Sequence, residues 1–299
     1  VSVDGGTIKL DGNYPVGTSN VALGDAAMSA VQAGADSNTA VGRLALTANT
    51  TADYNTAVGG NSLRANTTGH TNSSFGQDAM RFNSTGASNV AVGQQALHNN
   101  TTASQNTAVG YQASLNATTG AANTFVGGLS AGLGVVTGSH NVGLGAETLY
   151  RLTSGGSNVS IGYQALQFNT TGSSNVAIGR EALENNTASN NTAVGHNALQ
   201  ANTTGSYSTA VGYQSGLNST ANFNTSVGAS SLKATTTGLS NTAIGTSSMF
   251  YNTTGSYNTA IGEEALLRNT TASNNTAVGY NSGDANTSGY ENVFIGTAA

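Results

Sequence analysis

Hydrophobic and polar residues alternate in a pattern that returns about every 17 residues along most of the chain. A Val, Ile, Leu or, once, Phe followed by Gly marks each return, as at Val58-Gly59, Ile178-Gly179 and Ile261-Gly262. Consecutive glycines of this type are 16, 17 or 18 residues apart. The set is Gly24, Gly42, Gly59, Gly76, Gly93, Gly110, Gly127, Gly145, Gly162, Gly179, Gly195, Gly212, Gly228, Gly245, Gly262, Gly279 and Gly296. Such a period predicts an array of stacked structural repeats.

The apolar columns of the repeat predict short strands. The repeat reads N-T-A-V-G-x-x-A-L-x-x-N-T-T-G-S-x. Alternate residues of a strand point to opposite faces, so we expect the Val/Thr and Val/Ile/Leu columns to face the core and the small residue between them to face outward. A further column of Leu or Met, as at Leu63, Leu183 and Leu266, predicts a second short strand in each coil.

The remaining positions have the chemistry of turns. Asn-Thr-Thr-Gly recurs, for example over residues 66–69 and 252–255, and combines an Asn that can bond its own backbone with a Gly that tolerates positive φ. Another Asn opens nearly every coil, as at Asn55, Asn175 and Asn258. Because these residues stack in register, we expect them to form an Asn ladder.

A helical repeat is the competing interpretation, since a segment such as residues 181–186 could form a helical turn. Gly, Asn and β-branched residues interrupt every coil, however, and leave about eight residues for a helix, which is too short to be stable. The sequence therefore predicts an all-β chain: a parallel β-solenoid, or β-roll, of about 17 coils over residues 19–299, after a lead-in segment over residues 1–18. Because the chain lacks an initial Met and ends three residues after Gly296, we expect a fragment of a longer fibre.

The core of one such solenoid is thin. Each coil offers about three inward apolar side chains, each contributing about 1.5 to 3 kcal/mol when buried. Ordering the backbone costs about 1 to 2 kcal/mol per residue. Small residues on the opposite strand face would let a second backbone approach, so we predict a parallel homo-oligomer, most simply a homotrimer.

Charge changes the expected function more than the expected fold. Charged residues make up 7% of the chain, the net charge is −5, and Lys and Arg form no cluster, so we expect no nucleic-acid partner. No apolar run approaches the length of about 18 residues that a membrane span requires.

Catalytic and metal chemistry have few residues to draw on. The four histidines, His70, His98, His140 and His196, fall in four different columns of the repeat, so stacking would not bring them together. The 13 acidic residues are dispersed, whereas a polysaccharide-cleaving solenoid would need a cleft lined by carboxylates. We expect no catalytic residues, no metal site, no cofactor and no enzymatic activity.

Aromatic residues are the remaining candidates for binding. Tyr54, Tyr207, Phe223 and Tyr257 precede the position that opens a coil. The candidate glycan-stacking residues, which directly follow the strand glycine, are Tyr111, Tyr163, Tyr213 and Tyr280. In the alternative interpretation, each ring covers its neighbouring turn.

The strand motif resembles a known family. The pattern N-[ST/V]-[AV]-[IV]-G, found for example over residues 89–93, 175–179 and 258–262, is similar to the head repeat of YadA-like trimeric autotransporter adhesins. The resemblance covers residues 20–296 and implies a left-handed parallel β-roll with three chains side by side. The longer repeat and its Asn-Thr-Thr-Gly turn look like variants in tail-fibre and other virion proteins of bacteriophages, notably cyanophages.

These observations favour a structural fibre shaft or adhesin, most simply a phage tail fibre or virion appendage involved in host attachment. Such a protein would be extracellular, on a virion or cell surface. Its partners would be copies of itself, other virion or surface proteins at its ends, and a host surface glycan. The alternatives are a bacterial trimeric surface adhesin and an ice-binding β-solenoid. Exchange of Thr with Val in the strand column argues against ice binding if that column faces inward.

Overall fold

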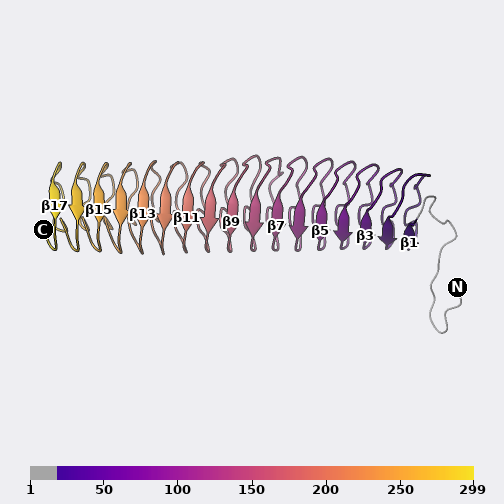
Figure 1. Cartoon of the computed structure of the whole chain (residues 1–299), viewed down its shortest axis with the longest axis horizontal. Helices are drawn as coiled ribbons and strands as arrows, with labels where there is room; N and C mark the ends of the chain where they lie inside the picture. The colour runs from indigo at the N-terminus through magenta and orange to yellow at the C-terminus, as the bar shows by residue number, and fades with distance from the viewer. Residues whose placement is uncertain (1–18) are drawn as a thin grey trace, which may run out of the picture. The chain divides into compact units, whose positions relative to one another are not determined.

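The computed structural model describes residues 19–299, so the expected lead-in segment over residues 1–18 lies outside the described residues. The chain divides into two compact units between Asn141 and Val142, and each is a stack of coils with one strand per coil (Figure 1). The strands of the first unit are β1 (Val21–Leu23), β2 (Thr39–Val41), β3 (Thr56–Val58), β4 (Ser73–Phe75), β5 (Val90–Val92), β6 (Thr107–Val109) and β7 (Thr124–Val126).

The second unit has the same construction. Its strands are β8 (Val142–Leu144), β9 (Val159–Ile161), β10 (Val176–Ile178), β11 (Thr192–Val194), β12 (Thr209–Val211), β13 (Thr225–Val227), β14 (Thr242–Ile244), β15 (Thr259–Ile261), β16 (Thr276–Val278) and β17 (Val293–Ile295). The prediction of an all-β parallel β-solenoid with a repeat of about 17 residues is therefore confirmed.

Neighbouring strands within a unit pair in parallel and without any shift of register. In β2 and β3, Ala40 lies beside Ala57 and Val41 beside Val58. The same register joins β14 to β15. Each column of the repeat thus becomes a row of like residues along the stack, about 4.8 Å apart.

The predicted orientation of the strands is wrong. The small residue at the strand centre faces the core, since Ala57, Ala177 and Ala260 are fully buried. The Thr or Val before it and the aliphatic residue after it face outward, and the side chain of Ile261 is 40% exposed. The interior of a coil is narrow, and the Leu or Met that enters from the opposite turn leaves room for only a small residue on the strand.

The two aromatic exceptions support this explanation. Phe125 occupies a strand centre and is buried, and the Leu column near it holds the small residues Ser114 and Ala131. A large side chain at one position thus replaces a large side chain at the other, which keeps the core at normal packing density.

The second strand expected in each coil is also absent from residues 19–299. The Leu column lies in a turn, where Leu46 and Leu63 adopt left-handed backbone conformations with φ of 49°. Their amides still bond to the next coil, as from Leu63 N to the carbonyl of Ala79 at 3.0 Å. The backbone here bends too tightly for a strand but keeps the inter-coil hydrogen bonding.

The predicted Asn ladder is confirmed, and a second ladder runs beside it. Asn55 N donates to Oδ1 of Asn38 at 2.9 Å, and Asn55 Nδ2 donates to the carbonyl of Gly69 at 2.9 Å. In the turn, Asn66 Nδ2 donates to the same carbonyl at 2.8 Å, and Asn83 Nδ2 donates to Oδ1 of Asn66 at 2.8 Å. Both Asn columns are buried, so polar side chains form part of the core.

The strand glycines are required by close approach between coils. Gly59 has a φ of 129°, and a Cβ added to it would lie 2.5 Å from the carbonyl oxygen of Gly76. Gly179 and Gly262 have similar values of φ, 131° and 137°. No other residue type fits this position without strain.

Candidate functional site

The outward face of the strands is the most extensive candidate surface. Each strand presents one Thr, Val or Ser and one aliphatic or aromatic side chain on this face. Members of the aliphatic column that are more than a third exposed include Phe75, Val92, Val126, Leu144, Ile178, Val211, Ile244, Ile261, Val278 and Ile295. Because the strands are in register, these side chains form an apolar stripe along each unit.

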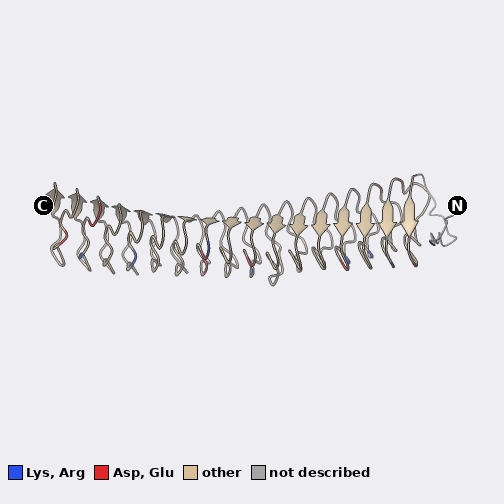
Figure 2. Cartoon of the chain, turned by 90° about the horizontal axis from the view of Figure 1, so that it is seen from below, with Lys and Arg blue, Asp and Glu red and all other residues tan. Residues whose placement is uncertain are grey.

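This face carries no charge. Figure 2 shows the Lys, Arg, Asp and Glu residues on the connecting segments, and none of the strands contains one. From β11 to β16 the first column of the face is unbroken Thr, formed by Thr192, Thr209, Thr225, Thr242, Thr259 and Thr276. An uncharged face of β-branched side chains is suited to packing against another surface rather than to ionic recognition.

The predicted glycan-stacking residues do not form one site. Tyr111, Tyr163, Tyr213 and Tyr280 all lie in the exposed column after the strand glycine. Tyr111 belongs to the first unit, and in the second unit three or more coils separate each Tyr from the next, which corresponds to about 14 Å or more. Two of the rings contact neighbouring side chains instead: Arg180 lies 5.8 Å from the ring of Tyr163, and His196 lies 5.6 Å from that of Tyr213.

The second aromatic column contains a closer pair. The rings of Tyr207 and Phe223 stack with their centroids 5.4 Å apart and an interplanar angle of 11°. Both side chains are more than half exposed. This pair comes from consecutive coils, and the sequence signal for it is an aromatic residue at the same position of two adjacent repeats.

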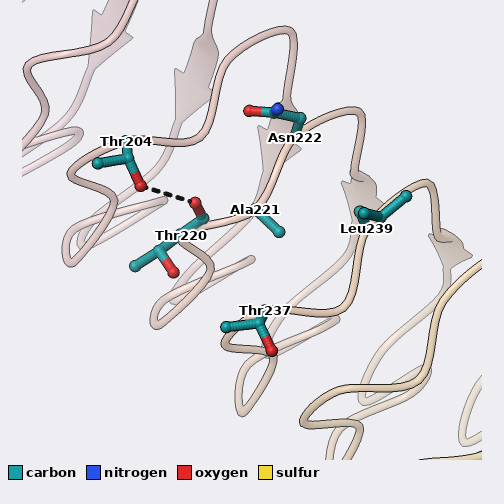
Figure 3. Close-up of a pocket in the computed structure, with 6 residues that line it drawn as sticks. All are labelled: Thr204, Thr220, Ala221, Asn222, Thr237 and Leu239. Atoms are coloured by element: carbon teal, nitrogen blue, oxygen red, sulfur yellow. Dashed lines mark hydrogen bonds between the residues drawn. The ribbon is translucent and has the colours of Figure 1, made fainter.

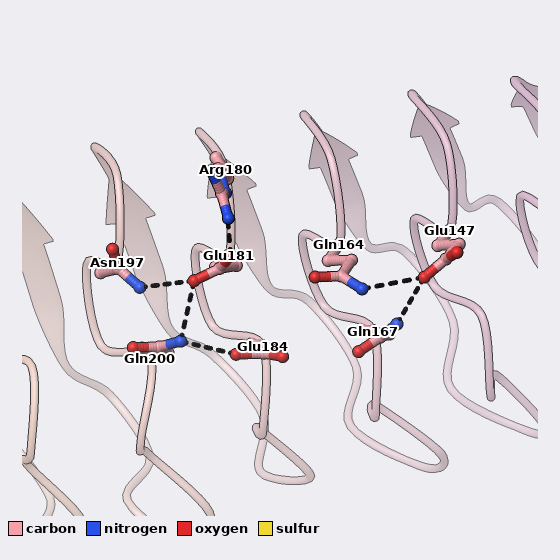
Figure 4. A network of polar contacts seen from close by, with 8 residues as sticks. All are labelled: Glu147, Gln164, Gln167, Arg180, Glu181, Glu184, Asn197 and Gln200. Atoms are coloured by element: carbon pink, nitrogen blue, oxygen red, sulfur yellow. Dashed lines mark hydrogen bonds and ion pairs between the residues drawn. The ribbon is translucent and has the colours of Figure 1, made fainter.

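Carboxylates in the second unit link consecutive coils (Figure 4). Glu147 Oε2 accepts hydrogen bonds from Nε2 of Gln164 at 2.9 Å and of Gln167 at 2.8 Å. Glu181 Oε2 accepts from Asn197 Nδ2 at 2.8 Å and Gln200 Nε2 at 3.0 Å. The two arrangements are alike, and they join neighbouring coils through side-chain amides.

The surroundings of Glu181 favour its ionised form. Partial burial raises the pKa of Glu181, but hydrogen bonds from Asn197 and Arg180 and the charges of Arg180 and His196 lower it further, so the pKa lies below its usual value. A carboxylate that already accepts several hydrogen bonds is suited to holding coils together and not to donating a proton.

Metal-ligand clusters and membrane helices were also sought. Within residues 19–299, no three His, Asp or Glu side chains lie close enough together to hold a metal ion. Nor does that part of the chain contain a helix with the length and apolar character of a membrane span.

A groove lies on the turn side of the second unit (Figure 3). It has a volume of about 370 Å³ and is lined by Thr204, Thr220, Ala221, Asn222, Thr237 and Leu239. The step from Gly212 to Gly228 is only 16 residues, and the missing residue is the second Thr of the turn. Thr204 and Thr237 therefore flank a coil that is one residue short, and Thr204 Oγ1 donates to the carbonyl of Thr220 at 3.2 Å.

No protein-family model matches this chain, and a search of curated proteins finds no significant match. The candidate surfaces are therefore interpreted from their own chemistry.

Proposed function

We propose that this chain is the shaft of an extracellular fibre in which parallel copies pack through the outward faces of their strands, most simply as a homotrimer. The observation that carries the proposal is the uncharged apolar stripe formed by residues such as Ile178 and Ile261. Soluble monomers rarely expose a contiguous apolar surface of this extent.

The contact differs from the one expected from the sequence. The Ala and Ser column lies inside the coil and takes no part in association, whereas the larger Thr, Val and Ile side chains are available to a neighbouring chain. Copies in register would place like coils beside one another and bury the stripe along its length. Three copies, and the left-handed coil, are what the resemblance to YadA-like head repeats implies.

The biological setting follows from the same resemblance. We propose a phage tail fibre or comparable virion appendage that takes part in host attachment, with other virion proteins at its ends. A bacterial trimeric surface adhesin is the alternative setting. Antibodies raised against the chain distinguish the two in electron micrographs, since they label virions in one case and cell surfaces in the other.

Sedimentation of the full chain tests the association. We expect a trimer, and we expect Ile261→Glu to shift it toward monomers because three carboxylates would meet in the apolar contact. Thr271→Glu, on an exposed turn, is the matched control and should remain trimeric. A stable folded monomer of the unaltered chain would contradict the proposal.

Ice binding is a second candidate because the structure places the Thr column outward. The row from Thr192 to Thr276 alternates with an aliphatic row on a regular lattice, about 4.8 Å by about 7 Å, that could order water. It requires the same face to stay free of other chains. Thermal hysteresis by a monomeric chain would support this candidate, and its absence would dismiss it.

A further inference from the structure

Four residues of the second aromatic column are aligned by backbone hydrogen bonds. Phe223 N donates to the carbonyl of Ser206 at 3.1 Å, Ser240 N to that of Asn222 at 3.2 Å, and Tyr257 N to that of Leu239 at 3.0 Å. Each bond joins a member of the column to the residue just before the preceding member. The four positions, Tyr207, Phe223, Ser240 and Tyr257, therefore form one row along the stack.

These four residues also share one backbone conformation. Their φ angles are 59°, 60°, 55° and 59° in the order of the row. Because the backbone is repeated, Cβ points in the same direction at each position. The stacked rings of Tyr207 and Phe223 show the result, since they lie one coil apart and nearly parallel.

Ser240 interrupts this row of rings. Phe223 and Tyr257 are two coil steps apart, about 9.6 Å, with only the small Ser240 side chain between them. A ring-shaped ligand halfway between them would lie about 4.8 Å from each aromatic ring, which is within stacking distance. We name this space, bounded by Phe223, Ser240 and Tyr257, the ring slot.

The groove beside the ring slot supplies hydrogen-bonding groups. Asn222 and Leu239 line the groove and directly precede Phe223 and Ser240 in the chain. The other polar groups of the groove are the hydroxyls of Thr204, Thr220 and Thr237 (Figure 3). Asn222 Oδ1 accepts a hydrogen bond from Ser206 N at 2.8 Å, whereas Asn222 Nδ2 has no partner within residues 19–299.

The surroundings have almost no charge. Residues 201–262 include a single charged residue, Lys233, and its Nζ lies 5.3 Å from the ring of Phe250 in a different column. A charged ligand would find no opposite charge in the ring slot or in the groove. Aromatic faces beside hydroxyl and amide groups suit a ligand that has apolar C–H faces and many neutral hydroxyls.

We propose that the ring slot and groove bind a neutral saccharide, with one pyranose ring between Phe223 and Tyr257 and the adjoining sugar in the groove. The site is built from one chain, so it does not rest on the proposed association. It differs from the glycan site expected from the sequence, because it uses the other aromatic column and a gap in that column.

Binding of the full chain to an array of neutral and sialylated oligosaccharides tests this proposal. We expect binding to neutral glycans, weakened at least tenfold by Tyr257→Ala. Ser240→Tyr should abolish binding because the new ring fills the slot, although it adds aromatic surface. Tyr54→Ala removes an exposed ring of the same column in the first unit and should leave binding unchanged.

Three outcomes would overturn the proposal. They are failure of the unaltered chain to bind any neutral glycan, undiminished binding by Ser240→Tyr, and binding restricted to sialylated glycans. A change in sedimentation caused by Ser240→Tyr would also overturn it, because the slot would then be a contact between chains. Far-ultraviolet circular dichroism of each variant establishes that the fold is retained, and Tyr257→Phe, which keeps the ring, should bind if Tyr257→Ala fails to fold.

Discussion

Phe294 and Gly283 share one space inside their coil. A Cβ added to Gly283 would lie 2.7 Å from Cδ2 of Phe294. Gly283 occupies the position that holds Leu or Met in most coils, and Phe294 the position that holds Ala or Ser. The large side chain has moved from the turn to the strand, while the volume of the core has been kept.

This exchange leads to a prediction about paired substitutions. Gly283→Leu alone should destabilise the β16 and β17 coils by about 1 to 3 kcal/mol, because the core would be overpacked. Phe294→Ala alone should destabilise them by leaving a cavity. The double variant restores the common arrangement and should recover most of the loss, as measured by amide hydrogen exchange in these strands. Losses that simply add would show that the two side chains do not share a space.

The strand glycines allow a test with adjacent residues. Gly59→Ala should lower the free energy of unfolding by about 2 kcal/mol or more, because the new Cβ meets the carbonyl of Gly76 at a positive φ. Gly60→Ala is the control, since no heavy atom lies within 4 Å of the added Cβ. Its effect should stay within about 0.5 kcal/mol. Equal effects in chemical denaturation would argue against the close approach of the coils.

The buried Asn ladder predicts a cost for removing one member. Asn72 Oδ1 accepts from Asn89 N at 3.0 Å, and Asn72 Nδ2 donates to the carbonyl of Gly86 at 2.9 Å. Asn72→Ala leaves these buried backbone groups without partners and should destabilise the fold by about 1 to 3 kcal/mol.

Asn218→Ala provides the comparison for the ladder, since Asn218 is an exposed Asn. It should change the midpoint of thermal unfolding little. If Asn72→Ala were equally mild, the ladder would contribute nothing to stability.

Several features of the fold were predictable because the repeat displays them directly. The regular return of Gly59, Gly76 and their equivalents establishes the period, and stacking in register follows from it. The buried Asn columns were predictable in part, since an Asn repeated at one position can bond to its own copies. The aromatic columns were visible too, but the stacking of Tyr207 on Phe223 required the geometry of the turn.

The orientation of the strands could not be taken from hydropathy alone. Val58 is larger and more apolar than Ala57, which favours an inward Val, yet Ala57 is the buried residue. A signal was present in the exceptions, because Phe294 coincides with Gly283 in the Leu column. That coincidence has meaning only once the two columns are known to face each other.

The sequence by itself thus determined the period, the parallel stacking and the ladders, because each depends on like residues recurring at one interval. The tertiary structure decided which face of the strand is buried, because that depends on the space left by the Leu or Met of the opposite turn. It also decided where a gap opens between rings, because the ring slot depends on the direction of side chains from successive coils.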